Sequence, residues 1–356
     1  VEAEHVGRQR HGQGDVDGLL HQGPLELGRL DLSLARGQTL GDAGAGGADP
    51  LAGLPRVRRV DMSRQPKGTL IAPPLLAAIG ARTSRIEIGT GVIDMRYENP
   101  LYLAEEAASL YQLSGGRVAL GVSRGAPEVA ERGWEAFGYR GEAPNGADVA
   151  RAHLEAFMAA VDGNGFATAA SLERQYPNMF QPGSALPVFP VAPELRKHIF
   201  YGSGTHASAE QTAKDGLNLM SSTLVSETTA QTLGEIQVDQ INRYRAAWKE
   251  AGHDWTPRVS VSRSIFPIVD GADMQRFGMQ ASGSDQVGAL PEVGSTTFGR
   301  TYAAEPDKLI EQLKTDEAIA EADTLLLTVP NQLGVAYNAH VIESILTHVA
   351  PAMGWR

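Results

Sequence analysis

From residue 70 to its C-terminus the chain alternates short apolar runs with helix-forming stretches. Short buried strands that alternate with helices imply parallel pairing and right-handed crossovers. The pattern predicts an α/β fold, a TIM (β/α)8 barrel, with a doubly wound open sheet as the alternative. The pattern contains six strands, two fewer than the eight of a TIM barrel. The first strands of the barrel are therefore incomplete unless residues before 67 supply them. Strands are expected at 85–93, 118–122, 198–201, 217–222, 258–269 and 324–329, helices at 74–83, 100–113, 207–215, 229–251, 306–313 and 335–349, and loops at 163–196 and 282–299.

Residues 1–66 differ in composition from the rest of the chain. They hold 12 Gly and 8 Arg but no Phe, Tyr, Trp, Ile, Lys or Asn. A segment without these side chains buries little apolar area with which to offset its ordering entropy. We expect either a poorly ordered tail or out-of-frame translation of GC-rich DNA, with short strands considered at 25–34 and 57–62. The barrel domain is expected to span 67–356.

The composition disfavours or excludes several classes of function. The formal net charge is −11, whereas binding to a nucleic-acid backbone draws on a surplus of Lys and Arg. The absence of Cys excludes disulfides and thiolate sites and fits a reducing compartment. No apolar run approaches the roughly 20 residues that span a bilayer, and no His pair has zinc-site spacing. We expect a cytoplasmic protein that binds no nucleic acid, membrane or metal.

Two of the expected strands end in motifs that suit a ligand. Parallel strands present their C-terminal ends at the face where ligands bind. Gly89 to Val92 either lets the backbone approach a flat ligand closely or marks a kink. Leu120 to Gly125 places Arg124 directly after a buried strand, which suits a phosphate or a structural salt bridge. Gly121 to Gly125 also reads G-x-S-x-G, so a hydrolase with Ser123 as nucleophile is an alternative.

A third motif, Tyr201-Gly-Ser-Gly-Thr-His-Ala-Ser208, lies between an expected strand and an expected helix. Small residues expose backbone N–H groups there, and Thr205 or Ser208 adds a hydroxyl at a helix N-terminus, which favours an anion. The motif lacks the Gly-Lys-Ser/Thr of a Walker A loop and the third glycine of the dinucleotide fingerprint. It predicts a phosphate site, with an ordinary capped helix as the alternative.

Several runs together resemble the luciferase-like, flavin-dependent monooxygenase family. They are ARTSRIEIGTGV at 81–92, NP at 99–100 with LAEEA at 103–107, LSGGRVALGVSRG at 113–125, GSGTHASAE at 202–210 and GLNLMSS at 216–222. The resemblance covers about residue 67 to the C-terminus, and LSGGR leading into GVSRG is its most specific part.

The resemblance implies a TIM barrel that binds reduced FMN, or the deazaflavin F420 as in related enzymes, at the strand C-termini. The Gly91–Val92 peptide would be cis and lie behind the flavin ring, Arg124 would hold the phosphate with the loop at 204–208, and Ser222 would lie beside the ring. The place of the family's histidine motif reads Ser-Arg-Gln at 63–65, so no catalytic residue is assigned. The implied cofactor contacts are Thr90, Gly91, Val92, Ser123, Arg124, Gly202, Ser203, Gly204, Thr205, Ser208 and Ser222.

The implied activity is that of an oxidoreductase, a monooxygenase. Reduced FMN from a separate flavin reductase and O₂ would oxygenate a small organic substrate, such as an aldehyde or ketone, in a homodimer. The loop at 163–196 is interpreted as a lid, with Tyr176 and Phe180 as apolar covers, or as a surface loop of no catalytic weight. Alternatives are an F420-dependent oxidoreductase, a non-catalytic flavin-binding protein and a flavin-free phosphate-binding isomerase or aldolase.

Overall fold

The computed structural model describes residues 59–61, 72–125, 130–227, 231–280, 283–290, 294–329 and 333–355. All of them belong to one compact unit, Gly47–Arg356. The strand considered at 25–34 and the positions 63–65 lie outside the described residues, as does the rest of 1–66 except Arg59–Asp61. Among the described residues, no helix is both long and apolar enough to cross a membrane.

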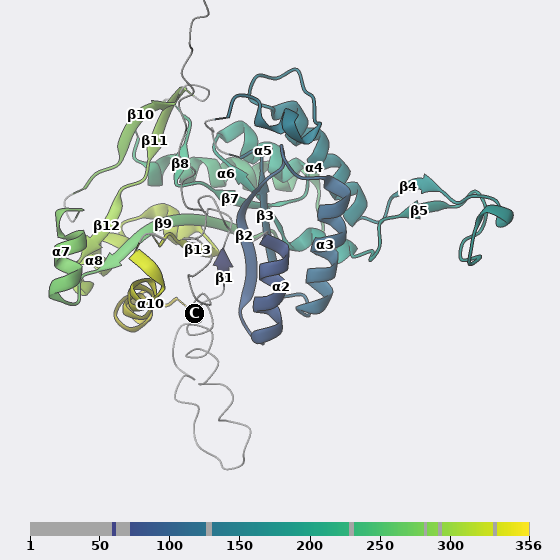
Figure 1. Cartoon of the computed structure of the whole chain (residues 1–356). Coiled ribbons are helices and arrows are strands. Elements are labelled where there is room, and N and C mark those ends of the chain that lie inside the picture. Colours follow the sequence, from purple (N-terminus) through teal and green to yellow (C-terminus); the bar gives the residue numbers. More distant parts are fainter. Residues whose placement is uncertain are drawn as a thin grey trace, which may run out of the picture. The chain divides into compact units, whose positions relative to one another are not determined.

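A parallel sheet forms the centre of the fold (Figure 1). Its neighbouring strands are, in order, β1 (Arg59–Asp61), β2 (Glu87–Asp94), β3 (Val118–Ser123), β6 (Ile199–Ser203), β7 (Asn218–Ser221) and β9 (Val259–Pro267). β9 pairs in parallel with β13 (Thr324–Leu327) along its first half and with β12 (Thr301–Ala304) along its second half. All six expected strands are present, and the segment considered at 57–62 supplies β1. The fold is α/β and TIM-barrel-like, as predicted, although no pairing joins β13 to β1 in the described part of the chain.

Helices cover the outside of this sheet, and their ends follow local signals in the sequence. The Asn99 side chain accepts the N–H groups of Leu101 and Tyr102, and Pro100 begins the helix, as the sequence predicted. The α-helices are α2 (Ala72–Arg82), α3 (Pro100–Leu113), α4 (Ala147–Val161), α5 (His206–Lys214), α6 (Leu233–Ala251), α7 (Gly271–Phe277), α8 (Pro306–Lys314), α9 (Glu317–Glu321), α10 (Gly334–Ser344) and α11 (Ala350–Met353). Short 3₁₀ turns are Gly133–Phe137, Leu172–Arg174, Pro193–His198 and Gly278–Gln280, and Ile345–Val349 is π-helical.

The core is divided into layers. One apolar cluster joins α2, α3 and α4 to the sheet, and a second joins α5, α6, α8 and α10 to it. A third, small cluster lies between them and consists of Ala119, Phe200 and Met220 from neighbouring strands, with Val92 and Leu326 packed against it. Such alternate inward-facing side chains fill the interior of a barrel. They form an apolar floor beneath the strand ends.

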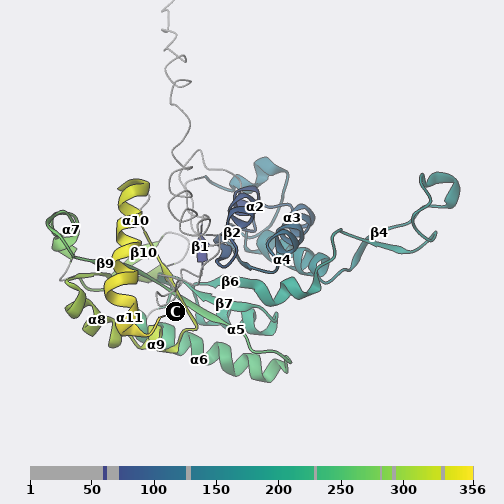
Figure 2. The ribbon, with the colours of Figure 1, turned by 90° about the horizontal axis from the view of Figure 1, so that it is seen from below.

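The loop expected at 163–196 contains a hairpin, β4 (Gly165–Thr168) with β5 (Ala185–Pro187). We call residues 163–192 the arm. The arm leaves the C-terminal end of α4 and returns to the start of β6, so it is rooted at the N-terminal ends of the strands. Both views show it extending away from the helices (Figures 1 and 2). The lid interpretation is therefore wrong, because the chain enters and leaves the arm at the end of the barrel opposite the ligand motifs.

The described residues of the Gly- and Ser-rich segment at 282–299 contain two strands, contrary to the expected loop. It forms the antiparallel hairpin β10 (Gln286–Leu290) and β11 (Gly294–Phe298). A two-residue strand, β8 (Leu224–Val225), pairs with β11. This three-stranded sheet ties the chain just after β7 to the segment before β12.

Candidate functional site

The structure brings together the predicted residues at the ends of β2, β3, β6 and β7. A Cβ placed on Gly202 would lie 3.2 Å from both Val92 Cγ1 and Ser123 Cβ, so the first three strand ends are in contact. The Ser222 N–H donates to the carbonyl of Ser203 at 3.4 Å, which adds the end of β7. A single rim therefore carries all the sequence-predicted motifs of these strands.

At the end of β2 the Gly91–Val92 peptide is cis, as the resemblance predicted. The pairing of β2 with β3 shifts register between Thr90 and Ile93, which marks a bulge. Thr90 is buried and its Oγ1 donates to the Gly121 carbonyl at 2.7 Å. A Cβ on Gly121 would lie 2.3 Å from the Thr90 carbonyl oxygen, so only glycine permits this approach.

The turn after β3 carries the half-buried Arg124, which has no acidic partner among the described residues. Ser123 is buried and its Oγ accepts the Gly125 N–H at 2.8 Å, and no His among the described residues bonds to it, which gives the hydrolase alternative no support. Arg124 forms no hydrogen bond or ion pair through its side chain with any described residue. Burial raises the pKa of the Tyr201 hydroxyl, and the nearby charge of Arg124 opposes that rise. Arg124 thus lies beside β6, and the salt-bridge alternative finds no partner there.

The helix after β6 begins with a reciprocal cap. Thr205 Oγ1 accepts the Ser208 N–H at 3.1 Å, and Ser208 Oγ accepts the Thr205 N–H at 3.1 Å. Both hydroxyls predicted to hold an anion are therefore engaged with each other. The Glu227 Oε1 accepts the N–H of His206 at 2.6 Å. Among the described residues, the Ala207 N–H has no partner.

Two buried glutamine side chains of α6, which were not predicted from the sequence, form hydrogen bonds to this rim. Gln237 and Gln240 are fully buried on α6. Gln240 Nε2 donates to the Thr205 carbonyl at 3.0 Å, and its Oε1 accepts the Ser221 hydroxyl at 2.5 Å. Gln237 Nε2 donates to the Ser222 carbonyl at 2.8 Å. The two amides fix the ends of β6 and β7, and their i, i+3 spacing on one helix face was the available signal.

A second cluster that was not predicted from the sequence lies at the rim directly after β2 and contains Asp94 and Arg96. Asp94 accepts side-chain hydrogen bonds from Arg96 Nε, at 3.0 Å to one oxygen and 3.2 Å to the other, and from Arg96 Nη2 at 2.6 Å; Arg96 is only 2% exposed. The guanidinium carbon lies 5.5 Å from the ring centroid of Trp134. Gly125 has φ +91, and a Cβ there would lie 1.9 Å from Asp94 Oδ2. This pair anchors the loop after β2 to the turn after β3.

Titratable groups gather beyond this pair. Burial, followed by the charges of Glu106 and Asp94, raises the pKa of Glu98. Burial and then Glu98 raise the pKa of Tyr139. His153 Nδ1 lies 2.7 Å from the Met95 carbonyl, so its Nε2 is the nitrogen left for other contacts. A cleft of ≈400 Å³ lies here, and its lining contains none of the predicted site residues; it is lined by Gly138, Tyr139, Arg140, Asp148, Val149, Ala152 and His153.

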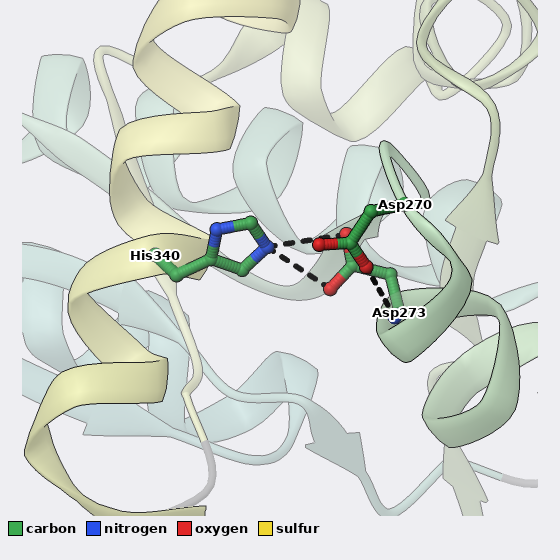
Figure 3. Close-up of side chains that lie close together, drawn as sticks. All are labelled: Asp270, Asp273 and His340. Carbon is green, nitrogen blue, oxygen red and sulfur yellow. Dashed lines mark hydrogen bonds and ion pairs between the residues drawn. The ribbon is translucent and has the colours of Figure 1, made fainter.

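Three side chains elsewhere could reach a single metal ion. Ligand atoms of Asp270, Asp273 and His340 lie within 4.8 Å of one another (Figure 3). Asp273 is buried, and its oxygens already accept hydrogen bonds from His340 Nε2 at 3.1 and 3.2 Å and from the Tyr337 hydroxyl. Asp270 caps α7 through the N–H of Ala272. These bonds account for the cluster as a contact between α7 and α10. No spacing in the sequence signalled this cluster, because 67 residues separate His340 from Asp273.

Comparison with known proteins decides the family. A model of the luciferase-like monooxygenase family matches residues 61–282, more than half of the chain. The chain belongs to this family. The matching region begins at β1 and ends just before the β10–β11 hairpin, so it contains all the predicted site residues.

The proteins that this luciferase-like chain resembles differ in the cofactor that their descriptions name. It is 46% identical over 59 residues to 4-hydroxyprotoasukamycin monooxygenase of Streptomyces nodosus subsp. asukaensis, a stretch that spans 16% of each chain. It resembles the oxygenating constituent of 3,6-diketocamphane monooxygenase of Pseudomonas putida, solved with FMN, at 20% identity over 83% of this chain and 87% of that one, with a TM-score of 0.53. It also resembles the coenzyme F420-dependent tetrahydromethanopterin reductase of Methanopyrus kandleri, at 14% identity over 81% and 88%, with a TM-score of 0.51. At these identities the two structures show the shared fold alone.

Proposed function

We propose that this chain is a flavin-dependent monooxygenase that uses reduced FMN and O₂ on a small organic substrate of the aldehyde or ketone type. The observation that carries the proposal is Arg124. Its guanidinium lies at the shared rim of β3 and β6 and has no acidic partner among the described residues. A guanidinium fork matches the oxygens of a phosphate. Membership of the luciferase-like family supports the same assignment.

The donor set at the rim fits a phosphorylated flavin. Arg124 is available for a dianion, and the Ala207 N–H has no partner in the described chain. A Cβ on Gly204 would meet only the Leu224 carbonyl oxygen, at 3.7 Å, so the backbone at Gly204 is open to close approach. The contacts proposed for the cofactor remain those predicted from the sequence at the ends of β2, β3, β6 and β7.

When bound, reduced flavin supplies the electrons that activate O₂ for insertion of one oxygen atom into the substrate. The chain's own residues position and shield it. Arg124 binds the phosphate, while Gln237 and Gln240 hold the strand ends on which the cofactor rests. Val92 and the apolar cluster beneath it exclude water from the inner side of the rim. Glu98 lies in the loop after β2, and burial raises its pKa, which makes this carboxyl the candidate for holding a proton.

The electron donor in this proposal is a separate flavin reductase, and the chain acts in the cytoplasm as a homodimer. The similar 3,6-diketocamphane monooxygenase structure is that of an oxygenating constituent, which supports a small-molecule substrate and such a reductase. A second candidate is an F420-dependent oxidoreductase that transfers hydride without O₂. The fold shared with the Methanopyrus kandleri reductase supports that candidate.

Binding and turnover separate the candidates. Flavin fluorescence would be titrated with FMN and with F420, and O₂ uptake would be followed with reduced FMN over a panel of aldehydes and ketones. We expect FMN binding and substrate-dependent O₂ uptake. Selective F420 binding would favour the hydride-transfer alternative, and binding of FMN without coupled turnover would favour a non-catalytic flavin-binding protein. Rejection of both cofactors would contradict the proposal.

Replacement of Arg124 tests the contact itself. We expect Arg124→Gln to weaken FMN binding by roughly tenfold to a hundredfold, the range for loss of a charge-assisted hydrogen bond, because a dianion loses its guanidinium. Riboflavin has no phosphate, so its affinity should not change. Arg140→Gln is the matched control, because Arg140 is an exposed arginine in the cleft lined by Tyr139 and His153, away from the rim. Equal FMN affinity in Arg124→Gln and the wild type would contradict the assignment.

A further inference from the structure

Glu227 places an acidic side chain where the phosphate is expected. Its Oε1 accepts the backbone N–H of His206, the first residue of α5, at 2.6 Å. The His206 Nδ1 lies 3.4 Å from the same oxygen. Unpaired N–H groups and the helix dipole stabilise negative charge at a helix N-terminus. The chain therefore supplies this helix end with an anion of its own.

The other backbone N–H groups in the first turn of α5 show which donors Glu227 leaves for a phosphate. Thr205 and Ser208 satisfy each other's N–H groups through the reciprocal cap. The cap leaves the N–H groups of His206 and Ala207 for an external anion. Glu227 holds the first of these two, and Ala207 keeps the second free in the described structure. A phosphate that binds both must take the place of the carboxylate.

The surroundings of Glu227 allow that exchange. Its side chain is 24% exposed, and it forms an ion pair with no Lys or Arg among the described residues. The backbone before it is fixed, since Ser226 N–H donates to the Gly204 carbonyl at 2.7 Å and Val225 pairs with Thr297 of β11. The carboxylate can therefore leave the helix end by rotation of its own side chain, while β8 stays paired.

We infer that Glu227 is an internal competitor for the cofactor phosphate, displaced when the phosphorylated flavin binds. The inference rests on the proposed function. Like charges repel at contact distance, so Glu227 weakens binding of a phosphorylated ligand and leaves binding of an unphosphorylated flavin unchanged. A weakened phosphate contact keeps the cofactor exchangeable. Exchange is what a chain requires if it receives its reduced flavin from a separate reductase.

The test compares FMN, riboflavin and inorganic phosphate on the full chain with Glu227→Gln and Glu227→Ala. The flavin dissociation constants come from quenching of flavin fluorescence, and that of inorganic phosphate from its competition with FMN. We expect both variants to bind FMN and phosphate about tenfold more tightly, the order for removal of one charge beside a dianion near the surface. Riboflavin affinity should stay within twofold of the wild type. The glutamine keeps an oxygen that accepts the His206 N–H.

Glu210→Gln is the matched control. Glu210 lies on the same helix, and its Oε1 is 3.5 Å from Arg243 Nη1, away from the first turn. It removes the same charge from the chain and should leave all three affinities unchanged. Equal or weaker FMN binding by both Glu227 variants, in a chain whose wild type binds FMN, would overturn the inference alone. Failure of the wild type to bind either flavin would instead contradict the proposed function and the inference with it.

Discussion

At the scale of single residues, an ion pair between Arg263 and Asp316 is buried away from the site. Arg263 on β9 and Asp316, the cap of α9, are both 3% exposed, and Arg263 Nε and Nη2 donate to Asp316 at 2.6 and 2.9 Å. The Tyr302 hydroxyl donates to the same carboxylate at 2.6 Å. Burial alone would raise the pKa of Asp316, but the hydrogen bonds and charge of Arg263 outweigh it and hold that pKa below its usual value.

Asp316→Asn should therefore lower the free energy of unfolding at pH 7 by about 3–5 kcal/mol, because it leaves Arg263 buried without its counter-charge. A depressed pKa gives stability that is present above the unfolded value of about 3.9 and is lost as the pH falls through the folded value. Urea unfolding of the wild type should show this loss below about pH 4, and the variant should show a shallower acid slope.

Glu311→Gln, on the exposed surface of α8, is the control for Asp316→Asn and should change the free energy of unfolding by less than about 0.5 kcal/mol. Parallel acid slopes in Asp316→Asn and the wild type would show that the carboxylate does not carry the predicted linkage.

The sequence located the residues of the rim only where each motif follows its strand directly. Arg124 comes directly after Ser123, the last residue of β3, so its position at the ligand end was predictable. Glu227 and Gln240 were not predictable, because their partners at the start of α5 lie 21 and 35 residues away. The capped helix that was considered as the alternative at Thr205 and Ser208 is present, and a serine three residues after a threonine is close to a capping-box pattern. The order of residues along the chain therefore predicts which residues lie at the strand ends. It does not predict which of their polar groups already have hydrogen-bond partners.

At the scale of elements, N-cap residues predicted well where helices begin. Gly and Ser content, in contrast, predicted loops where the structure has strands. Thr232 caps α6 by bonding the N–H of Glu235, and the helix begins within four residues of its expected start. The segment at 282–299 was expected to be a loop because it is rich in Gly and Ser. Its order comes from pairing with β8, about 70 residues earlier in the chain, and no window of local sequence contains that information.

The arm is the element least supported by the rest of the fold. β4 is exposed along its whole length, and Tyr176 is fully exposed. The phenyl rings of Phe180 and Phe189 stack on each other, with centroids 6.3 Å apart. At its root, Arg196 Nη2 lies 2.5 Å from Asp162 Oδ2. A two-stranded hairpin of this kind adds little stability in water.

Replacement of residues 165–187 by a short Gly-Ser linker should change the free energy of unfolding by less than about 1 kcal/mol, since few buried contacts are lost. FMN affinity and turnover should be unchanged, because the arm is rooted at the opposite end of the strands. Urea unfolding measures the change in stability, and O₂ uptake measures the turnover.

Tyr176→Ser in the intact arm is the companion variant for the linker replacement and should behave as the wild type does. Loss of coupled turnover in a linker variant that remains folded would restore the lid interpretation.

At the scale of the whole molecule, a long-range ion pair joins the two sides of the sheet. Arg258 Nη1 and Nη2 donate to the two oxygens of Glu87 at 2.9 and 3.0 Å, across 171 residues of sequence. Arg258 also lies 4.8 Å from the ring centroid of Phe200 in the interior cluster. Glu87 begins β2, beside the first core cluster, and Arg258 directly precedes β9, beside the second. The pair therefore couples the two clusters at the N-terminal ends of the strands.

Glu87→Gln should lower the free energy of unfolding by about 1 kcal/mol, near the upper limit for a partly exposed pair, because the geometry is bidentate. The loss should shrink in 1 M NaCl, where exposed charges are screened. Urea unfolding at two salt concentrations measures it, with exposed Glu105→Gln on α3 as the control. A loss that is equal at both concentrations would point to packing and not to charge.

The root of the arm has a consequence for how this chain can change over time. Substitutions in residues 163–192 touch neither the apolar floor beneath the strand ends nor the turn that carries Arg124. The chain can therefore acquire new neighbours at one pole while selection preserves its chemistry at the other, and relatives of this protein should vary in arm sequence independently of the substrates they oxidise.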